Sequence, residues 1–122
     1  LYLKRNQYTK AEPLLKEAVQ IKLARVGKNH PDYLLSLSNL AQLYVRKKDY
    51  PQAEKLFLEL VGTRRELLGD RNPNYATAIN GLAVVYARQG KYDQAIKLNE
   101  EALEIIRTTF GPKHERYAAV LN

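Results

Sequence analysis

One ten-residue pattern occurs three times in this chain at a constant interval. Its copies begin at Tyr2, Tyr44 and Tyr86, so that each lies 42 residues after the one before. Every copy has a tyrosine, five intervening residues, a second tyrosine, two further residues and an alanine. This pattern suits the end of one helix, a tight turn and the start of another helix. The chain is therefore predicted to be an array of repeated helical hairpins.

Other residue types return at the same interval. All nine tyrosines fall into three sets of three, which predicts that they are packing residues of the repeat and not scattered binding residues. Glycine, alanine and leucine form further sets. The sets are Tyr2, Tyr44 and Tyr86; Tyr8, Tyr50 and Tyr92; Tyr33, Tyr75 and Tyr117; Gly27, Gly69 and Gly111; Ala11, Ala53 and Ala95; Leu14, Leu56 and Leu98; and Leu37, Ile79 and Leu121.

The order of apolar residues, glycines and prolines predicts helices throughout and no strand. Glycine suits the residue just after a helix, and proline suits the first helical position. The expected elements are a helix tail over 1–6, helices over about 9–26, 31–47, 52–68, 72–88 and 92–110, and a helix beginning at 115. In the 9–26 helix, Leu14, Ala18 and Ile21, with Leu15 and Val19 beside them, are expected to form one broad apolar face. Pro13 is expected in the first turn.

The repeat period sets the expected organisation of the chain. We expect one domain over 1–122, with repeat units at roughly 1–30, 31–72, 73–114 and a partial unit at 115–122. The sequence starts and stops inside a motif, so we expect it to be part of a longer array. The Leu60–Thr63 stretch departs most from the repeat, because Leu60 stands where Ala18 and Ala102 occur and Gly62 falls inside a helix. This departure indicates either a local bend with a bulkier contact or ordinary sequence drift.

The charge is unevenly distributed along the chain. The net charge is +7, yet residues 1–48 hold ten basic and three acidic residues, whereas residues 49–122 hold ten of each. The excess could attract an acidic partner, or neighbouring repeats could balance it. No apolar run approaches the roughly 20 residues of a membrane helix. The absence of cysteine excludes disulfides and fits a cytoplasmic location.

These sets of equivalent positions, which we call columns, resemble those of a known family. Leu40-Ala41-x-x-Tyr44, followed by Tyr50-x-x-Ala53-x-x-x-Phe57, resembles the tetratricopeptide repeat (TPR). The 42-residue period and the His30-Pro31-Asp32 linker are similar to the kinesin light chain type of this repeat. The resemblance implies an all-α, TPR-type α-solenoid, a right-handed superhelix of antiparallel helix hairpins with about three repeats, truncated at both ends.

No catalytic constellation is evident in the sequence. His30 and His114 occupy the same loop position in different repeats, too far apart to share a metal ion. There is no glycine-rich phosphate loop and no serine nucleophile motif. We therefore expect no enzyme activity, no cofactor and no metal site.

The surface that the fold exposes is the remaining candidate for function. In stacked TPR hairpins the first helix of each pair lines a concave groove. If Leu40, Ala41 and Tyr44 pack inward, the opposite stripe of that helix faces the groove. The predicted peptide-binding residues are Lys4, Ser38, Asn39, Gln42, Arg46, Asn80, Val84, Arg88 and Asn122.

Two of these columns have a consistent chemistry. Lys4, Arg46 and Arg88 lie 42 residues apart and are all basic. Ser38, Asn80 and Asn122 lie at the same interval and are small hydrogen-bonding residues. Such columns suit an extended peptide with acidic side chains. By resemblance, kinesin light chain repeats bind acidic motifs of cargo adaptors in this groove. The alternative for the basic column is that each cation complements a helix dipole.

The resemblance also separates this chain from TPRs that bind a chaperone's C-terminal carboxylate. Those repeats use a lysine and an asparagine as a clamp on this helix, whereas the matching positions here hold Ser38 with Gln42 and Asn80 with Val84. The clamp is absent, so that ligand is disfavoured.

Three functions are therefore compared. The leading one is a non-enzymatic scaffold that binds a peptide or protein, with acidic peptides as candidates, in the manner of cargo and adaptor binding by kinesin light chains. The second is a structural spacer or self-association module, joined through apolar repeat ends such as Leu1, Leu3 and Leu121. The third is electrostatic binding of nucleic acid or anionic lipid by the basic first repeat, without sequence specificity or membrane insertion. Every tyrosine is assigned to packing, so none remains for base stacking.

Overall fold

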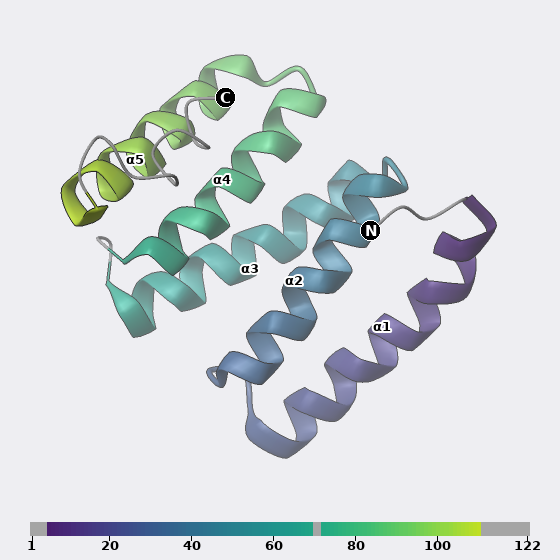
Figure 1. The fold of residues 1–122 in the computed structure, drawn as a ribbon. Coiled ribbons are helices and arrows are strands. Elements are labelled where there is room, and N and C mark those ends of the chain that lie inside the picture. The colour runs from purple at the N-terminus through teal and green to yellow at the C-terminus, as the bar shows by residue number, and fades with distance from the viewer. Residues whose placement is uncertain (1–4, 70–71, 111–122) are drawn as a thin grey trace. The chain divides into compact units, whose positions relative to one another are not determined.

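The chain folds into a series of α-helices (Figure 1). The computed structural model describes residues 5–69 and 72–110, and every regular element within these ranges is helical. Four of the five helices lie within two residues of their predicted bounds. The helices are α1 (Arg5–Val26), α2 (Pro31–Arg46), α3 (Tyr50–Leu68), α4 (Pro73–Arg88) and α5 (Tyr92–Phe110).

The start of α1 differs from the prediction. A turn was expected before residue 9, but α1 is already helical at Arg5, and Pro13 consequently lies inside the helix. In the other two copies the turn contains a residue with positive φ, Lys48 (φ 65) or Gly90 (φ 81). The equivalent residue, Asn6, is helical. Asparagine tolerates either conformation, so local sequence does not decide between a turn and a helix here.

The two longer connections begin and end alike. Gly27 and Gly69 each follow a helix with φ of 85, a conformation in which glycine ends helices without steric cost. A side-chain acceptor then caps the next helix: His30 Nδ1 accepts from Asp32 N at 3.0 Å, and Asn72 Oδ1 accepts from Asn74 N at 2.8 Å. These caps satisfy backbone donors that the first helical turn leaves without partners.

The chain divides into two compact units, residues 1–56 and residues 57–122, and each is described by itself. In the first unit α1 packs along α2. Val19 is the buried apolar residue of α1, and one side of α2 is buried. The buried residues of α2 are Tyr33, Leu34, Leu37, Leu40, Ala41, Leu43 and Tyr44. The division into one domain of repeat units remains a prediction.

In the second unit, α4 and α5 enclose an apolar core. Burying each larger side chain of such a core contributes about 1.5–3 kcal/mol. The core consists of Tyr75, Ala76, Ile79, Ala102, Ile105 and Ile106, with Val61 and Leu98 packed against it. The C-terminal part of α3 also contacts α4 closely, because a Cβ on Gly81 would lie 2.6 Å from the Phe57 ring.

Two packing predictions are wrong for individual residues. Leu14 is 67% exposed and Ile21 is also exposed, although both were expected on the apolar face of α1. Val19, which was expected beside them on the same broad face, is buried. Tyr92 is 65% exposed, whereas Tyr8 and Tyr50 are partly buried. Tyr8 lies beside Arg46, Lys47 and Lys48 at the end of α2.

The irregular stretch in α3 is accommodated without interrupting the helix. α3 continues from Tyr50 to Leu68 through Gly62. Leu60 is fully buried, like Ala102 one period later. Gly62 is exposed, and a Cβ there would meet nothing within 4 Å. The larger Leu60 therefore fills interior space, whereas Gly62 has no packing function.

Candidate functional site

Helix α2 presents a polar stripe on the side opposite its buried residues. Asn39, Gln42 and Arg46 are exposed, and Ser38 is partly buried. Their spacing of three or four residues places them along one face of the helix. Leu35 begins the same stripe and is 60% exposed. An accessible surface thus carries the four predicted site residues of this helix.

Helix α4 carries the equivalent positions in the second unit. Val84 is 40% exposed, Arg88 is exposed and Asn80 is partly buried. The opposite side of α4 packs into the apolar core through Ile79. The stripes of α2 and α4 belong to separate units, so a single surface formed by both remains a prediction. Two further predicted residues, Lys4 and Asn122, lie outside the described residues.

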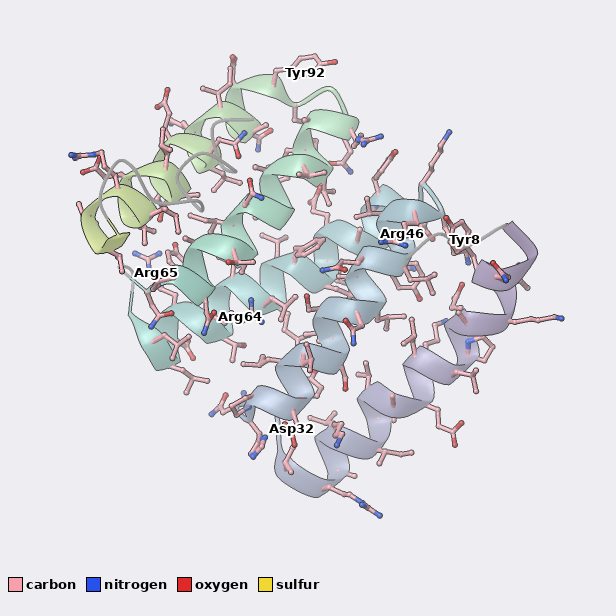
Figure 2. All side chains as sticks on the ribbon, in the orientation of Figure 1. Tyr8, Asp32, Arg46, Arg64, Arg65 and Tyr92 are labelled. Carbon is pink, nitrogen blue, oxygen red and sulfur yellow. The ribbon has the colours of Figure 1, made fainter. Side chains whose placement is uncertain are left out.

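A hollow with basic walls lies at the C-terminal end of α2. It has a volume of about 280 Å³ and belongs entirely to the first unit. Figure 2 shows two of its residues, Arg46 from α2 and Tyr8 from α1. We call it the basic hollow. It is lined by Tyr8, Thr9, Arg46, Lys47 and Lys48. Arg46 therefore ends the polar stripe of α2 and also lines this hollow.

A carboxylate on α1 holds one wall of the basic hollow in place. The Oε2 atom of Glu12 lies 2.9 Å from Lys16 Nζ and accepts a hydrogen bond from the Tyr44 hydroxyl at 3.3 Å. Its Oε1 atom accepts from Lys47 Nζ. Lys47 Nζ also lies 5.9 Å from the centre of the Tyr44 ring, a weak cation–π distance.

This cluster lowers the pKa of the Glu12 carboxyl. Hydrogen bonds from Lys47 and Lys16 lower the pKa of the Glu12 carboxyl from 4.5 to about 2, against the opposing effect of desolvation. The hydrogen bond to Glu12 is also the main cause that raises the pKa of Lys16. The cluster escaped prediction because Lys47 is 35 positions from Glu12. Only the pair of Glu12 and Lys16, one helical turn apart, is visible in the sequence.

Another basic residue, Arg64, lies in the C-terminal part of α3 and contacts the start of α4. Arg64 Nη1 donates to the Asn74 carbonyl at 3.2 Å, and burial lowers the pKa of the Arg64 guanidinium. At the equivalent place in the first unit, Lys22 Nζ is 3.9 Å from Asp32 Oδ2. Figure 2 labels Arg64 and Asp32, which mark these two places.

Neither a metal-binding cluster nor a membrane-spanning helix is present in residues 5–69 and 72–110. They contain no group of three or more histidine and acidic side chains that could hold a metal ion. No helix in these ranges is both long and apolar enough to span a membrane.

The sequence matches the profile of the tetratricopeptide repeat family in three overlapping segments, residues 1–66, 44–107 and 74–122. No match was found among curated proteins.

Solved structures give a consistent likeness. A Podosopora anserina protein described as a kinesin light chain with nearly identical TPR-like repeats is 25% identical, with a TM-score of 0.86 over 94% of this chain. BtubC (BKLC) from P. vanneervenii is 20% identical, with a TM-score of 0.84 over 94% of this chain. The N-terminal domain of stress-induced protein-1 from C. elegans has a TM-score of 0.56 at 16% identity, covering 94% of this chain and 98% of that domain.

The matched region is a part of the larger structures. This chain covers 55% of the Podosopora anserina protein and 46% of BtubC. The likeness therefore concerns the repeats, and it confirms the predicted all-α solenoid of kinesin light chain-type repeats.

Proposed function

Because the chain belongs to the tetratricopeptide repeat family, we propose that it is a non-enzymatic scaffold that binds a peptide segment of a protein partner along the stripes of α2 and α4. TPR proteins bind protein partners, and the fold is that of an interaction module. The finer proposal is that the partner is acidic and binds as cargo or adaptor peptides bind to kinesin light chains. We place this binding in the cytoplasm.

The exposed stripe of α2 is the observation that carries the proposal. It combines an apolar residue, Leu35, with the amides of Asn39 and Gln42 and the guanidinium of Arg46. Side-chain amides can hydrogen-bond the backbone of an extended peptide. A guanidinium can bind a carboxylate through two parallel hydrogen bonds, which adds specificity. Val84 and Arg88 offer an apolar and a basic contact on α4.

The proposal predicts the effect of reversing charge at Arg46 and Arg88 together. We expect Arg46→Glu with Arg88→Glu to weaken binding of an acidic peptide roughly tenfold, because two attractive contacts become repulsive. Peptides would be selected on an array of acidic and neutral sequences, and the affinity of the best would be measured by calorimetry. Both residues are exposed, so the circular dichroism melting curve should change little.

A matched control changes the same total charge elsewhere. Lys55 on α3 and Lys97 on α5 are exposed and lie outside the two stripes, so Lys55→Glu with Lys97→Glu should leave affinity nearly unchanged. Equal losses in both double variants would show a response to net charge alone. Unchanged affinity after reversal at Arg46 and Arg88 would remove the stripes as the binding site.

Self-association is a second candidate because α1 exposes apolar side chains. Leu14 is the most exposed of them, and Ile21, Leu23 and Val26 are exposed as well. Leu14 and Ile21 are seven residues apart and lie on the same side of the helix, which could join another chain. Light scattering separates the two functions, since a concentration-independent monomer would argue against self-association. A spacer function without any ligand predicts no selection on the peptide array.

A further inference from the structure

We propose that the basic hollow binds a phosphoryl group, supplied by a phosphorylated residue of a partner peptide. The proposal rests on the proposed function for the source of that group. The chemistry of the hollow itself comes from its lining residues.

The lining supplies hydrogen-bond donors and positive charge. Arg46, Lys47 and Lys48 follow one another in sequence, and all three line the hollow with the hydroxyls of Tyr8 and Thr9. A phosphate monoester carries about −1.5 to −2 charge at neutral pH and three strong acceptor oxygens. A set of charged and neutral donors around one open space is suited to such a group.

Within residues 5–69 and 72–110, the ion pairs of Glu12 compensate only part of the charge of the lysines in this lining. Glu12 contacts the wall through Lys47, but the same carboxylate also bonds Lys16 and the Tyr44 hydroxyl. Two lysines thus share one carboxylate. Lys48 makes no ion pair within residues 5–69 and 72–110. The hollow keeps an excess of positive charge even with Glu12 ionised.

The backbone of Lys48 gives an independent reason to assign the side chain a function. Its φ of 65 lies in the left-handed region, which residues with a side chain rarely adopt. One period later the same turn is made by Gly90 with φ of 81. Glycine suits this conformation better than lysine does. A lysine held in an unfavourable backbone conformation beside a basic hollow indicates that its ammonium group is used.

The charge and number of donors favour a phosphoryl group over a carboxylate. A carboxylate has one negative charge and two oxygens in a plane, whereas a phosphoryl group has three oxygens that point in different directions. The donors of the hollow come from both α1 and the end of α2. The three oxygens of a phosphoryl group can accept from both sets of donors at once.

The test uses three peptides that differ at one residue. Acetylated and amidated Gly-Gly-Ser-Gly-Gly is compared with its phosphoserine and glutamate forms by NMR titration of the isotope-labelled chain, with inorganic phosphate as a fourth probe. The phosphoserine peptide should bind roughly tenfold more tightly than the serine peptide, with the glutamate form between them. The amide signals of Tyr8, Arg46 and Lys48 should shift most.

Lys48→Gly provides a variant that should fold. The turn at Gly90 shows that glycine is compatible with this conformation, so the variant removes the ammonium without straining the backbone. We expect it to lose most of the roughly tenfold preference for phosphoserine. The control, Lys97→Ala, removes one exposed charge from α5 and should keep the preference.

Three outcomes would overturn the proposal. Equal binding of the three peptides, or a preference unchanged in Lys48→Gly, removes the phosphoryl site. Inorganic phosphate binding as tightly as the phosphoserine peptide would show that the peptide is not the source of the group. None of these outcomes contradicts the scaffold proposal, which is tested with unphosphorylated acidic peptides at Arg46 and Arg88. Arg88 does not line the hollow and therefore distinguishes the two sites.

Discussion

The connection from α1 to α2 and the connection from α3 to α4 share their end geometry but not their charges. Each begins with a glycine of φ 85 and ends with an extended capping residue, His30 or Asn72, followed by proline. Across the first, Lys22 faces the carboxylate of Asp32, whereas across the second, Arg64 donates to the backbone carbonyl of Asn74. The glycine and the helix cap therefore recur in both connections, whereas the ion pair of Lys22 and Asp32 is replaced in the second by a hydrogen bond to the backbone.

The largest expected effect on stability comes from removing the side-chain cap that both connections have. His30→Ala and Asn72→Ala each remove the side-chain acceptor at a helix start and should each lower the free energy of unfolding by about 1 kcal/mol. Urea denaturation measures this loss. His30→Asn should retain most of the stability, because asparagine supplies the acceptor in the other copy.

A loss confined to one of the two alanine variants would break the comparison. It would mean that the helix start of the unaffected connection is held by its glycine and proline, with the acceptor contributing little. Hydrogen exchange at the first turns of α2 and α4 would locate the effect.

A somewhat smaller effect is expected from the Glu12 cluster, which is not repeated. One period later Lys16 and Lys47 are replaced by Leu58 and Gln89. Glu12→Gln should lower stability at neutral pH by about 0.5–1 kcal/mol, a range that allows for the partial solvent exposure of the cluster. The measurement is urea denaturation at a series of pH values.

The pH dependence of this loss has a definite sign. The pKa of Glu12 falls from 4.5 to about 2 in the folded chain, so its contribution is complete above pH 4.5 and disappears as the pH falls towards 2. Native protein and Glu12→Gln should therefore converge in stability over this interval. Gln20→Ala, a change at an exposed and uncharged position of the same helix, should remain parallel to the native protein. A constant difference for Glu12→Gln across the interval would contradict the assignment.

The smallest expected effect concerns the charge difference itself. Asn74→Asp gives Arg64 a carboxylate near the N-terminus of α4 and should raise stability by about 0.5 kcal/mol. Asp32→Asn should lower stability by a few tenths of a kcal/mol, since the exposed pair with Lys22 is 3.9 Å apart. A double-mutant cycle with Arg64→Ala isolates the new pair. Coupling close to zero would show that Arg64 does not reach the new carboxylate.

Features encoded within a few residues could be predicted from sequence. The starts of α2 and α4 follow from Pro31 and Pro73, and the ends of α1 and α3 follow from Gly27 and Gly69. The face of α2 follows from its apolar spacing. The start of α1 could not be predicted, because Asn6 is compatible with a turn and with a helix. Burial of Leu14 and Tyr92 was expected from their columns, but burial depends on neighbouring helices that a column does not specify.

The candidate site was predictable only in part. The α2 stripe with Asn39, Gln42 and Arg46 follows from helical periodicity. The basic hollow does not, because it combines Tyr8 with Lys48 and depends on how α1 packs on α2. Lys48 nevertheless carried a signal, since it stands where the next copy has Gly90.

The contact between Gly81 and Phe57 has a consequence for the stripe of α4. A hydrogen atom is all that Gly81 presents to the buried ring, and a methyl group would lie 2.6 Å from one ring carbon. The distance between α3 and α4 is thus set by a missing side chain, and any larger residue would act as a wedge. The neighbouring Asn80 and Val84, which is one helical turn away, would shift with the helix, so a change at this contact would be transmitted to a ligand on the stripe of α4.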